Sequence, residues 1–305
     1  MNVNYRNWEP NQGLEEKQAE VYNKNNPDNP QPVTAKDIID RYEREKIDPK
    51  TVQYAFTKDG KLLAYIQARD YPNVEETHIG YPWGAENCPK EVQDKLFKDM
   101  LEYLKQRKET LTILANAPAE KEEIIGFFKE KGLVEKSRGY RYELKLEDIS
   151  KDEYTEQEYA TRLATPEDIP LLVNLVKAFG NYAGQFNSDE DIVNYFKDRV
   201  FKDGHAILVF KGETLVMASA PLIYQIPNVE GERVILRFHA YLSDNESAYK
   251  PLLIALAKEC VSTGYGTDKP LSTFIGPRNS TFANILEKYN PTKVVTGFGF
   301  GLKDS

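Results

Sequence analysis

Segments with the hydrophobic pattern of β-strands alternate along this chain with segments whose hydrophobic residues recur at helical spacing. Residues 51–60 and 61–70 are rich in β-branched and aromatic residues and share the turn Asp59-Gly60, which predicts a hairpin. Residues 89–104 instead carry apolar side chains at helical spacing, so one face of a helix is expected to be buried. Over the first half, the predicted order is strand, two helices, three strands, helix, strand, helix and two closing strands.

Capping residues support several of these helices. Thr34 precedes an amphipathic segment and Asp37 follows three residues on, which approximates a capping box. Pro89 fits the first position of the next helix, with Cys88 as its cap. Gly132 ends the last helix of this half.

The second half repeats the predicted order of elements. Thr165-Pro166-Glu167-Asp168 opens a helix, and a hairpin turns at Gly212. Equivalent positions of the two halves, such as Arg6 and Arg162, are separated by a nearly constant number of residues. The pattern therefore indicates that the two halves share one fold, although side-chain identity between them is slight.

The domain limits follow from this repeat. Residues 147–158 are acidic and almost free of apolar side chains, so we expect a linker there. The prediction is an N-terminal domain over residues 1–146 and a C-terminal domain over residues 159–305. The fold class is α/β (α+β), with a mixed, mostly antiparallel sheet flanked by helices in each domain.

Composition and charge exclude several functions. The chain has 305 residues, 40% of them hydrophobic and 29% charged, and its formal net charge of -8 argues against a surface devoted to nucleic acid or to anionic lipid. No apolar run approaches the roughly 18 residues that span a bilayer, and the N-terminus lacks the features of a signal peptide, so a cytoplasmic protein without membrane partners is expected. Two cysteines and three scattered histidines predict neither a disulfide framework nor a zinc site.

One stretch raises a question of ligand binding. Residues 78–97, HIGYPWGAENCPKEVQDKLF, lead from a strand through a glycine-containing loop into a helix. The first amides of a helix have no internal partners and carry partial positive charge, so this arrangement suits a phosphate group.

The order of elements resembles the GNAT (GCN5-related N-acetyltransferase) fold, and the whole chain resembles a tandem pair. The second half carries the more specific match: PRNSTFANILEKYNP places Asn279 where the family commonly has an Asn after its fifth strand, and VVTGFGFGL is similar to the family's closing hairpin. In the first half, AEKEEIIGFFKEKGL resembles the same final helix.

The resemblance implies acetyl-CoA as a cofactor and an amine as the acceptor. In the family, acetyl-CoA enters between the splayed fourth and fifth strands, and its pyrophosphate rests on amides before the next helix. Carried onto this sequence, the cofactor-binding positions are Phe238, Ala240, Tyr241, Asn245, Ser247, Asn279 and Phe282 in the second half, and Gly80, Asn87, Cys88, Lys90 and Asn116 in the first.

The sequence departs from the family at the pyrophosphate loop. That loop resembles [RQ]-x-x-G-x-[GA], but Cys88 takes the basic position and Glu91 and Gln93 take the two small ones. The second half has the acidic residues Asp244 and Glu246 in the corresponding segment.

The family's general acid, a Tyr on the last helix, also has no direct counterpart. Its position falls on Phe128 in the first half and on Leu286 in the second. Tyr289 lies three residues late and would need a shift of register.

Other residues allow two interpretations each. His239, on a predicted central strand, is a candidate general base or a structural histidine, as are Glu76 and His78 in the first half. Tyr81 and Trp83 either wall a ligand cleft or fill the gap between splayed strands.

Three functions remain open at this point. The first is an acyltransferase that moves an acetyl group from acetyl-CoA to an amine on a small molecule or peptide. The second is a non-catalytic protein of the same fold that binds a ligand or partner. The third, a tRNA-dependent aminoacyl transferase, is disfavoured by the acidic charge.

Overall fold

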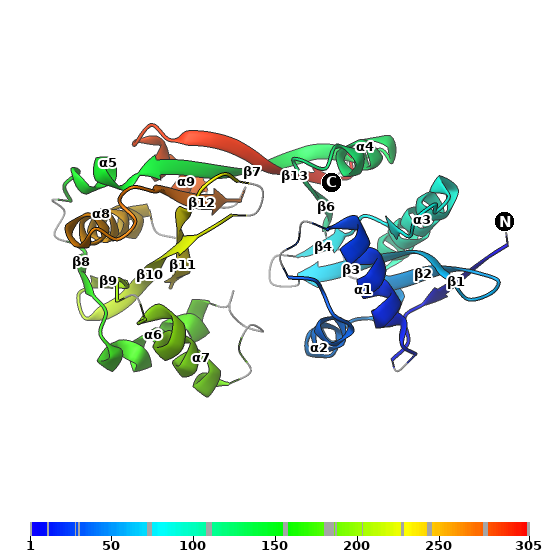
Figure 1. Ribbon diagram of the computed structural model, residues 1–305, viewed down its shortest axis with the longest axis horizontal. Helices are drawn as coiled ribbons and strands as arrows, with labels where there is room; N and C mark the ends of the chain where they lie inside the picture. The colour runs from blue at the N-terminus through cyan, green and yellow to red at the C-terminus, as the bar shows by residue number, and fades with distance from the viewer. Residues whose placement is uncertain are drawn as a thin grey trace. The chain divides into compact units, whose positions relative to one another are not determined.

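The structure, a computed structural model, describes residues 2–10, 12–27, 29, 31–71, 75–107, 112–154, 158–179, 186, 188–202, 204–226, 229–242, 246–276 and 280–303. These residues form two compact units (Figure 1). The first contains residues 1–138 and 296–305, and the second contains residues 139–295.

The first unit contains a mixed sheet with helices on both faces. Its elements in chain order are β1 (Val3–Asn7), α1 (Leu14–Asn25), α2 (Ala35–Glu45), η1 (Pro49–Thr51), β2 (Val52–Thr57), β3 (Leu62–Tyr71), β4 (Glu76–Ile79), β5 (Trp83–Gly84), α3 (Lys90–Gln106), β6 (Thr112–Pro118) and α4 (Glu122–Glu130), followed by the start of β7 (Val134–Lys145) and the end of β13 (Thr292–Gly301). The strand order is β1-β2-β3-β4-β6-β13. Its β4–β6 contact is parallel and its β1–β2, β2–β3, β3–β4 and β6–β13 contacts are antiparallel.

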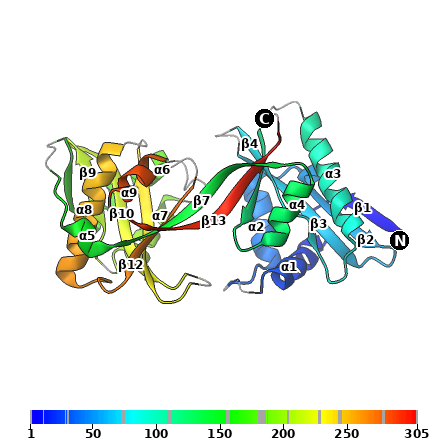
Figure 2. The ribbon, with the colours of Figure 1, turned by 90° about the horizontal axis from the view of Figure 1, so that it is seen from above.

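Helices α3 and α4 and helices α1 and α2 flank the sheet of the first unit (Figure 2), and each pair covers an apolar core on its own face of the sheet. Helices α3 and α4 bury residues such as Leu96 and Phe128 against Ile79 and Ala115. Helices α1 and α2 bury Leu14, Val21, Ile38 and Tyr42 against the opposite face. The sheet is therefore buried on both sides over most of its length, which suits its β-branched and aromatic strands.

The second unit repeats this arrangement. Its elements are the end of β7, α5 (Leu146–Ser150), β8 (Ala160–Leu163), η3 (Pro166–Asp168), α6 (Ile169–Phe179), α7 (Asp189–Tyr195), η4 (Phe196–Val200), β9 (Ile207–Lys211), β10 (Thr214–Tyr224), β11 (Arg233–Tyr241), α8 (Glu246–Thr263), β12 (Pro270–Ile275), α9 (Ser280–Glu287) and the start of β13. The strand order is β7-β12-β11-β10-β9-β8, with a parallel contact between β11 and β12. Helices α8 and α9 cover one face of the sheet, and α6 and α7 cover the other.

The two closing strands each belong to both units. The division of the chain falls within β7, after Arg138, and within β13, after Val295. In the first unit, β13 pairs with β6 from Gly297 to Gly301, and in the second unit β7 pairs with β12. Each central sheet is thus completed by a strand from the other half of the sequence. The sequence predicted two strands within residues 133–146, but a single twelve-residue strand, β7, lies there.

The expected linker falls inside the second unit. Leu146 and Ile149 of α5 are buried in its core, and Tyr159 is buried in the same cluster. Residues 147–158, which their acidic composition suggested to be a linker, are thus attached to the core of the second unit by these side chains. The compact units therefore divide at strands β7 and β13 instead of at residues 147–158.

Most local signals in the sequence are confirmed. Thr34 and Asp37 form a reciprocal capping box at the start of α2. Gly60, Gly132 and Gly212 adopt positive φ at the turns and helix end where they were expected. Helix α3 begins one residue later than predicted, with Pro89 at the cap position.

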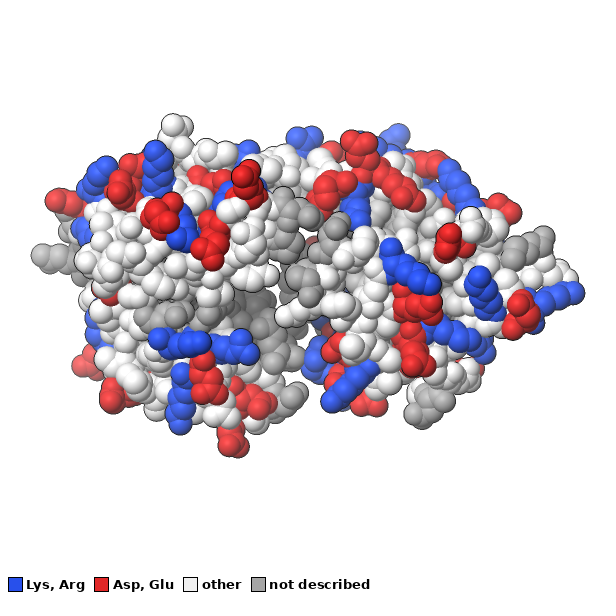
Figure 3. Space-filling model, viewed as in Figure 1, with Lys and Arg blue, Asp and Glu red and all other residues white. Residues whose placement is uncertain are grey.

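Acidic and basic side chains are interspersed on the face shown in Figure 3, with no single-sign patch among the described residues. No helix in the described ranges is long and apolar enough to cross a membrane. The described residues also contain no group of three or more His, Cys, Asp or Glu side chains suited to holding a metal ion.

Candidate functional site

A fork between two parallel strands lies at the centre of each sheet. In the first unit, β4 and β6 pair from Glu76 opposite Thr112 to His78 opposite Leu114 and then separate. In the second unit, β11 and β12 pair only at Val234 opposite Leu271 and Ile235 opposite Ser272. Beyond each fork, one backbone edge of the fourth strand has no ladder partner from the fifth, so it can bind an extended ligand.

The fourth strand of each unit also contains a bulge near its fork. In the second unit, the register of β10 against β11 shifts by one residue between Ala220 and Pro221. In the first, Ile79 pairs with Ala68, but the next paired residue, Trp83, lies opposite Tyr65, which leaves one extra residue between them. A bulge redirects the side chains that follow it.

In the first unit, Tyr81 fills the opening beyond the fork. Its hydroxyl donates a 2.8 Å hydrogen bond to Glu123 on α4, and its ring centroid lies 5.1 Å from that of Phe127 and 5.2 Å from that of Trp83. Burial raises the pKa of Tyr81, and the Glu123 carboxylate raises it further. Tyr81 therefore links the bulged strand to α4. Its side chain occupies the space that a ligand bound in this fork would need.

The loop before α3 is closed by its own side chains. Gln93 Nε2 donates to the Pro82 carbonyl at 2.7 Å, and a Cβ added to Gly84 would approach the Cβ of Cys88 to 2.9 Å. The Cys88 amide donates to the Ala85 carbonyl at 3.0 Å. These contacts leave little room for a pyrophosphate group on this loop.

Cys88 is a protonated thiol. Burial raises the pKa of Cys88 to about 11, and the charge of Glu91 contributes. The N-terminus of α3 therefore does not activate this thiol, which contrasts with helix termini that lower a cysteine pKa.

The other cofactor positions predicted in the first unit have internal roles. The Gly80 amide donates to the Gln67 carbonyl at 2.8 Å. Asn87 adopts φ 62° in the loop. Lys90 Nζ forms a 2.6 Å ion pair with Glu130 between exposed side chains.

Asn116 contacts His78 of the neighbouring strand, and His78 in turn contacts Glu76. Asn116 Nδ2 lies 2.8 Å from His78 Nδ1, and His78 Nε2 lies 3.0 Å from Glu76 Oε2. When the amide donates to Nδ1, the proton of the neutral imidazole is on Nε2 and is donated to Glu76. The Tyr71 ring packs 4.7 Å from the imidazole. The chain Glu76–His78–Asn116 has the groups that a general base needs, but it sits in the unit whose opening Tyr81 fills.

In the second unit, the predicted site residues of β11 lie beyond the fork. On the ladder with β10, His239 is opposite Ser219, Ala240 is opposite Ala218, and Tyr241 is opposite Met217. Ala240 is fully buried. Asn245 and Asn279 lie outside the described residues, as do the side chains of Phe238, His239, Tyr241 and Ser247.

Phe282 and Tyr249 connect α9 to α8. Their rings stack with centroids 4.6 Å apart and an interplanar angle of 21°, and both side chains are buried. Phe282, which the sequence assigned to the cofactor, therefore lies in the apolar core of the second unit.

The opposite face of the second fork carries a charged cluster that sequence reasoning missed. Glu143 Oε1 lies 3.0 Å from Arg233 Nε and 3.2 Å from Arg141 Nε. Ser272, the last β12 residue before the strands part, is only 1% exposed, and its hydroxyl has no hydrogen-bond partner among the described residues. The signal in the sequence was the placement of Arg141 and Glu143 at alternate positions of one strand, which puts both on one face.

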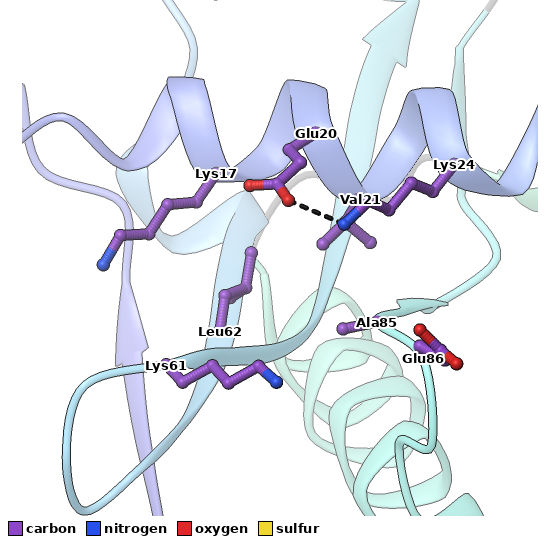
Figure 4. A pocket seen from close by; sticks show the side chains of 8 residues that line it. All are labelled: Lys17, Glu20, Val21, Lys24, Lys61, Leu62, Ala85 and Glu86. Carbon is purple, nitrogen blue, oxygen red and sulfur yellow. Dashed lines mark hydrogen bonds and ion pairs between the residues drawn. The ribbon is translucent and has the colours of Figure 1, made fainter.

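A surface pocket of about 210 Å³ lies elsewhere in the first unit (Figure 4). Its lining residues are Lys17, Glu20, Val21, Lys24, Lys61, Leu62, Ala85 and Glu86. Lys24 forms an exposed ion pair with Glu20 at 2.7 Å, and Lys17 Nζ donates to the Gly60 carbonyl at 3.2 Å. The pocket is thus lined by side chains of both charges.

Comparisons with known proteins identify the architecture. No protein-family model matches the sequence, and no curated protein matches it significantly. Solved structures do match: a GCN5-related N-acetyltransferase from Sphaerobacter thermophilus has a TM-score of 0.51 at 11% identity, covering 98% of this chain and 94% of that one. The chain has the GNAT fold.

Two further GNAT-type neighbours cover nearly the whole chain. A probable N-acyltransferase from Enterococcus faecalis V583 has a TM-score of 0.57 at 13% identity, over 98% of this chain and 72% of that one. A tandem GNAT protein from the clavulanic acid biosynthesis pathway has a TM-score of 0.51 at 10% identity, over 98% of each chain. The resemblance drawn from the sequence is therefore confirmed at the level of the fold.

Within this GNAT fold, Tyr289 lies beyond the end of α9 and has a specific hydrogen-bond partner. Helix α9 ends at Glu287, and the Tyr289 hydroxyl donates to Asp152 Oδ2 at 2.8 Å. Burial raises the pKa of Tyr289, and the Asp152 carboxylate raises it further. Lys250 Nζ lies 3.4 Å from the same Asp152 oxygen. The Tyr289 hydroxyl proton is thus donated to the Asp152 carboxylate, which also forms an ion pair with Lys250.

Proposed function

We propose that the protein transfers an acyl group from a coenzyme A thioester to an amine, and that the second unit carries the reaction. The observation that carries this proposal is the parting of β11 from β12 after Ile235 and Ser272. The open strand edge that results suits the amide groups of a pantetheine arm, which can pair with backbone as another strand does.

The two units differ in how well they suit such a cofactor. In the first unit, Tyr81 occupies the opening and Gln93 closes the loop at the start of α3. In the second unit, Tyr249 in the first turn of α8 directs its ring into the core against Phe282, where it is fully buried. A large residue there does not project toward a phosphate group. These contrasts support the second unit as the binding unit.

A bound coenzyme A thioester supplies an activated acyl carbon: the amine nitrogen bonds to that carbon, the carbon–sulfur bond breaks, and a thiol is released. The β11 backbone beyond the fork holds the arm, and Asn279 is a candidate for bonding it. We assign His239 as the base that takes the proton of the ammonium group, because its backbone lies beyond the fork, opposite Ser219. The nitrogen loses its second proton to solvent as the amide forms, and the thiolate takes a proton from solvent, since thiolate is a fair leaving group without a dedicated acid.

Binding of acetyl-CoA tests this proposal directly. Ligand at about 100 times its dissociation constant adds roughly 2.7 kcal/mol to the free energy of unfolding, which thermal unfolding detects. Asn279→Ala should weaken that shift, while the matched variant Asn116→Ala in the first unit should leave it intact, because the Asn116 amide contacts His78. The absence of any shift at millimolar acetyl-CoA would refute the transferase proposal, and loss of the shift in Asn116→Ala alone would move the site to the first unit.

A non-catalytic ligand-binding protein is the second candidate. It is supported by the filled opening of the first unit and by the commitment of the Tyr289 hydroxyl to Asp152. Release of free thiol from acetyl-CoA in the presence of a panel of amines separates the two functions. Binding without thiol release for any amine favours this second candidate.

A further inference from the structure

The fork of the second unit has a cluster of charged side chains on the face opposite α8 and α9, made of Glu143, Arg141 and Arg233. Glu143 on β7 lies directly across from Ser272 on β12, and Ser272 lies across from Ile235 on β11. Leu271 is in the core beneath α8, so Ser272, its neighbour in the strand, faces the other way. The charged side chains of Glu143, Arg141 and Arg233 therefore lie on the face to which the Ser272 hydroxyl points.

The charges in this cluster do not balance. Arg141 and Arg233 both place Nε near the same oxygen of Glu143, so two guanidinium groups share one carboxylate. Their side chains are only 13% and 15% exposed, and that of Glu143 is 17% exposed. One positive charge is left in excess among largely buried groups, and such a charge is costly unless an anion accompanies it.

The two arginines differ in how their hydrogen-bond donors are used. The terminal NH1 of Arg233 donates to the carbonyls of Glu230 and Gly231 at 2.7 and 2.9 Å, which fixes that guanidinium in place. Among the described residues, Arg141 makes a single polar contact, its ion pair with Glu143. Its terminal nitrogens therefore have donors left for a planar anion, which a guanidinium binds in a bidentate manner.

The charged cluster lies next to the fork where the acyl transfer is proposed to occur. Arg141 lies opposite Phe274, two residues beyond Ser272 and therefore past the point where β11 and β12 part. Phe274 is 53% exposed, so the strand edge there is accessible. Ser272, at the fork itself, has a buried hydroxyl with no described partner, which can donate to a second oxygen of the same anion.

We propose that Arg141 and Ser272 bind the carboxylate of the acceptor, so that the amine substrate is an amino acid or a similar amine bearing a carboxylate. The inference rests on the proposed acyl transfer in the second unit. A single excess positive charge matches a carboxylate monoanion better than a phosphate dianion. The carboxylate at the fork leaves the amino group of a small amino acid close to the opening where the thioester is proposed to lie.

The test compares matched pairs of amines that differ only in the carboxylate. L-alanine and ethylamine form one pair, and L-lysine and cadaverine form another. Binding is measured on the full chain by calorimetry without any coenzyme A, so that the result does not depend on catalysis. The amino acids should bind and their decarboxylated partners should bind at least about tenfold more weakly, as expected for charge-assisted hydrogen bonds.

Two variants and a control locate the site. Arg141→Gln should weaken L-alanine binding by roughly 10- to 100-fold. Ser272→Ala removes a hydroxyl that has no described partner, so it should fold well while still weakening the amino acid. Arg138→Gln, which removes the same charge from an exposed arginine of β7 paired with Glu135, should change nothing.

The outcomes separate this inference from the transferase proposal. Amino acid binding that Arg141→Gln and Ser272→Ala weaken supports the carboxylate site, even if acetyl-CoA does not bind. Acetyl-CoA turnover with equal preference for ethylamine and L-alanine would overturn the carboxylate site while leaving acyl transfer in place. Binding of inorganic phosphate in preference to all carboxylates, or unchanged amino acid binding in both variants, would also overturn it.

Discussion

The Tyr81 hydroxyl donates a 2.8 Å hydrogen bond to Glu123, which ties the bulged fourth strand of the first unit to the last helix of that unit. The ring of Tyr81 also packs edge-on against Phe127. The first unit thus has the forked strands, but the opening beyond the fork is filled by the packed side chain of Tyr81.

Tyr81 should therefore contribute to stability like a core residue. Tyr81→Ala should lower the free energy of unfolding by about 3 kcal/mol, because it removes a buried ring. Tyr81→Phe should cost about 1 kcal/mol through the lost hydrogen bond to Glu123. Urea denaturation measures both, and Tyr224→Phe, at a 40% exposed tyrosine, is the control. A Tyr81→Ala variant as stable as the parent would show that the opening is not filled by packing.

The first unit should not fold from the first half of the sequence alone. Its sheet includes residues Gly297–Gly301 of β13, which pair with Leu114–Pro118. A fragment of residues 1–146 lacks that strand and leaves the β6 edge unpaired. We expect this fragment to show no cooperative thermal unfolding until a peptide of residues 292–303 is added.

A peptide variant provides the control for this experiment. A Cβ at Gly299 would lie too close to the hydroxyl of Ser137, which would have to rotate away, so the peptide carrying Gly299→Val should restore folding less well than the parent peptide. Cooperative unfolding of the 1–146 fragment alone would contradict the role assigned to β13.

Cys88 should be a poorly reactive thiol despite its place before a helix. With its pKa raised to about 11, roughly a thousandth of it is thiolate at pH 8. Labelling by a disulfide reagent should be slow at pH 8 and accelerate up to about pH 11. Glu91→Gln should shift this rise to lower pH, because the Glu91 charge raises the pKa of Cys88. The buried Cys260, whose pKa is raised to about 12, should react later still, and Cys88→Ser identifies which thiol is labelled.

The sequence predicted the fold well because its signals are local. The Thr34–Asp37 capping box and the Asp59-Gly60 turn involve residues close in sequence, and the structure contains both as expected. The exchange of β7 and β13 was missed because it depends on which distant strand completes a sheet. Nothing in the local pattern around Gly139 distinguishes one long strand from a hairpin.

The candidate site was harder to predict for the same reason. Glu91 and Gln93 correctly signalled an altered loop, but the contact of Tyr81 with Glu123 needs the folded strand and helix together. The cluster around Arg141 and Ser272 joins three strands, so no single motif announces it.

Asp168 should make the stability of the second unit sensitive to acid. Arg162 donates to both of its carboxylate oxygens at 2.6 Å, and this pairing lowers the pKa of Asp168. A carboxyl whose folded pKa lies below its unfolded value, about 3.9, stabilises the protein above that pH and loses this contribution as pH falls through the folded pKa. Asp168→Asn should thus be less stable than the parent at pH 7 and show a shallower loss of stability below about pH 4. Asp189→Asn, at an exposed ion pair with Lys177, is the control and should shift the curve little.

Tyr289 should be dispensable for catalysis and useful for stability. A general acid contributes roughly 100- to 10,000-fold to a rate, so its removal is easy to detect. Because the Tyr289 hydroxyl donates to Asp152, we expect Tyr289→Phe to keep thiol release from acetyl-CoA within about twofold while lowering the free energy of unfolding by about 1 kcal/mol. Asp152→Asn should cause a similar loss of stability, since it weakens the same hydrogen bond and the contact with Lys250. A hundredfold fall in turnover for Tyr289→Phe, with stability unchanged, would instead make Tyr289 the acid that protonates the departing thiolate.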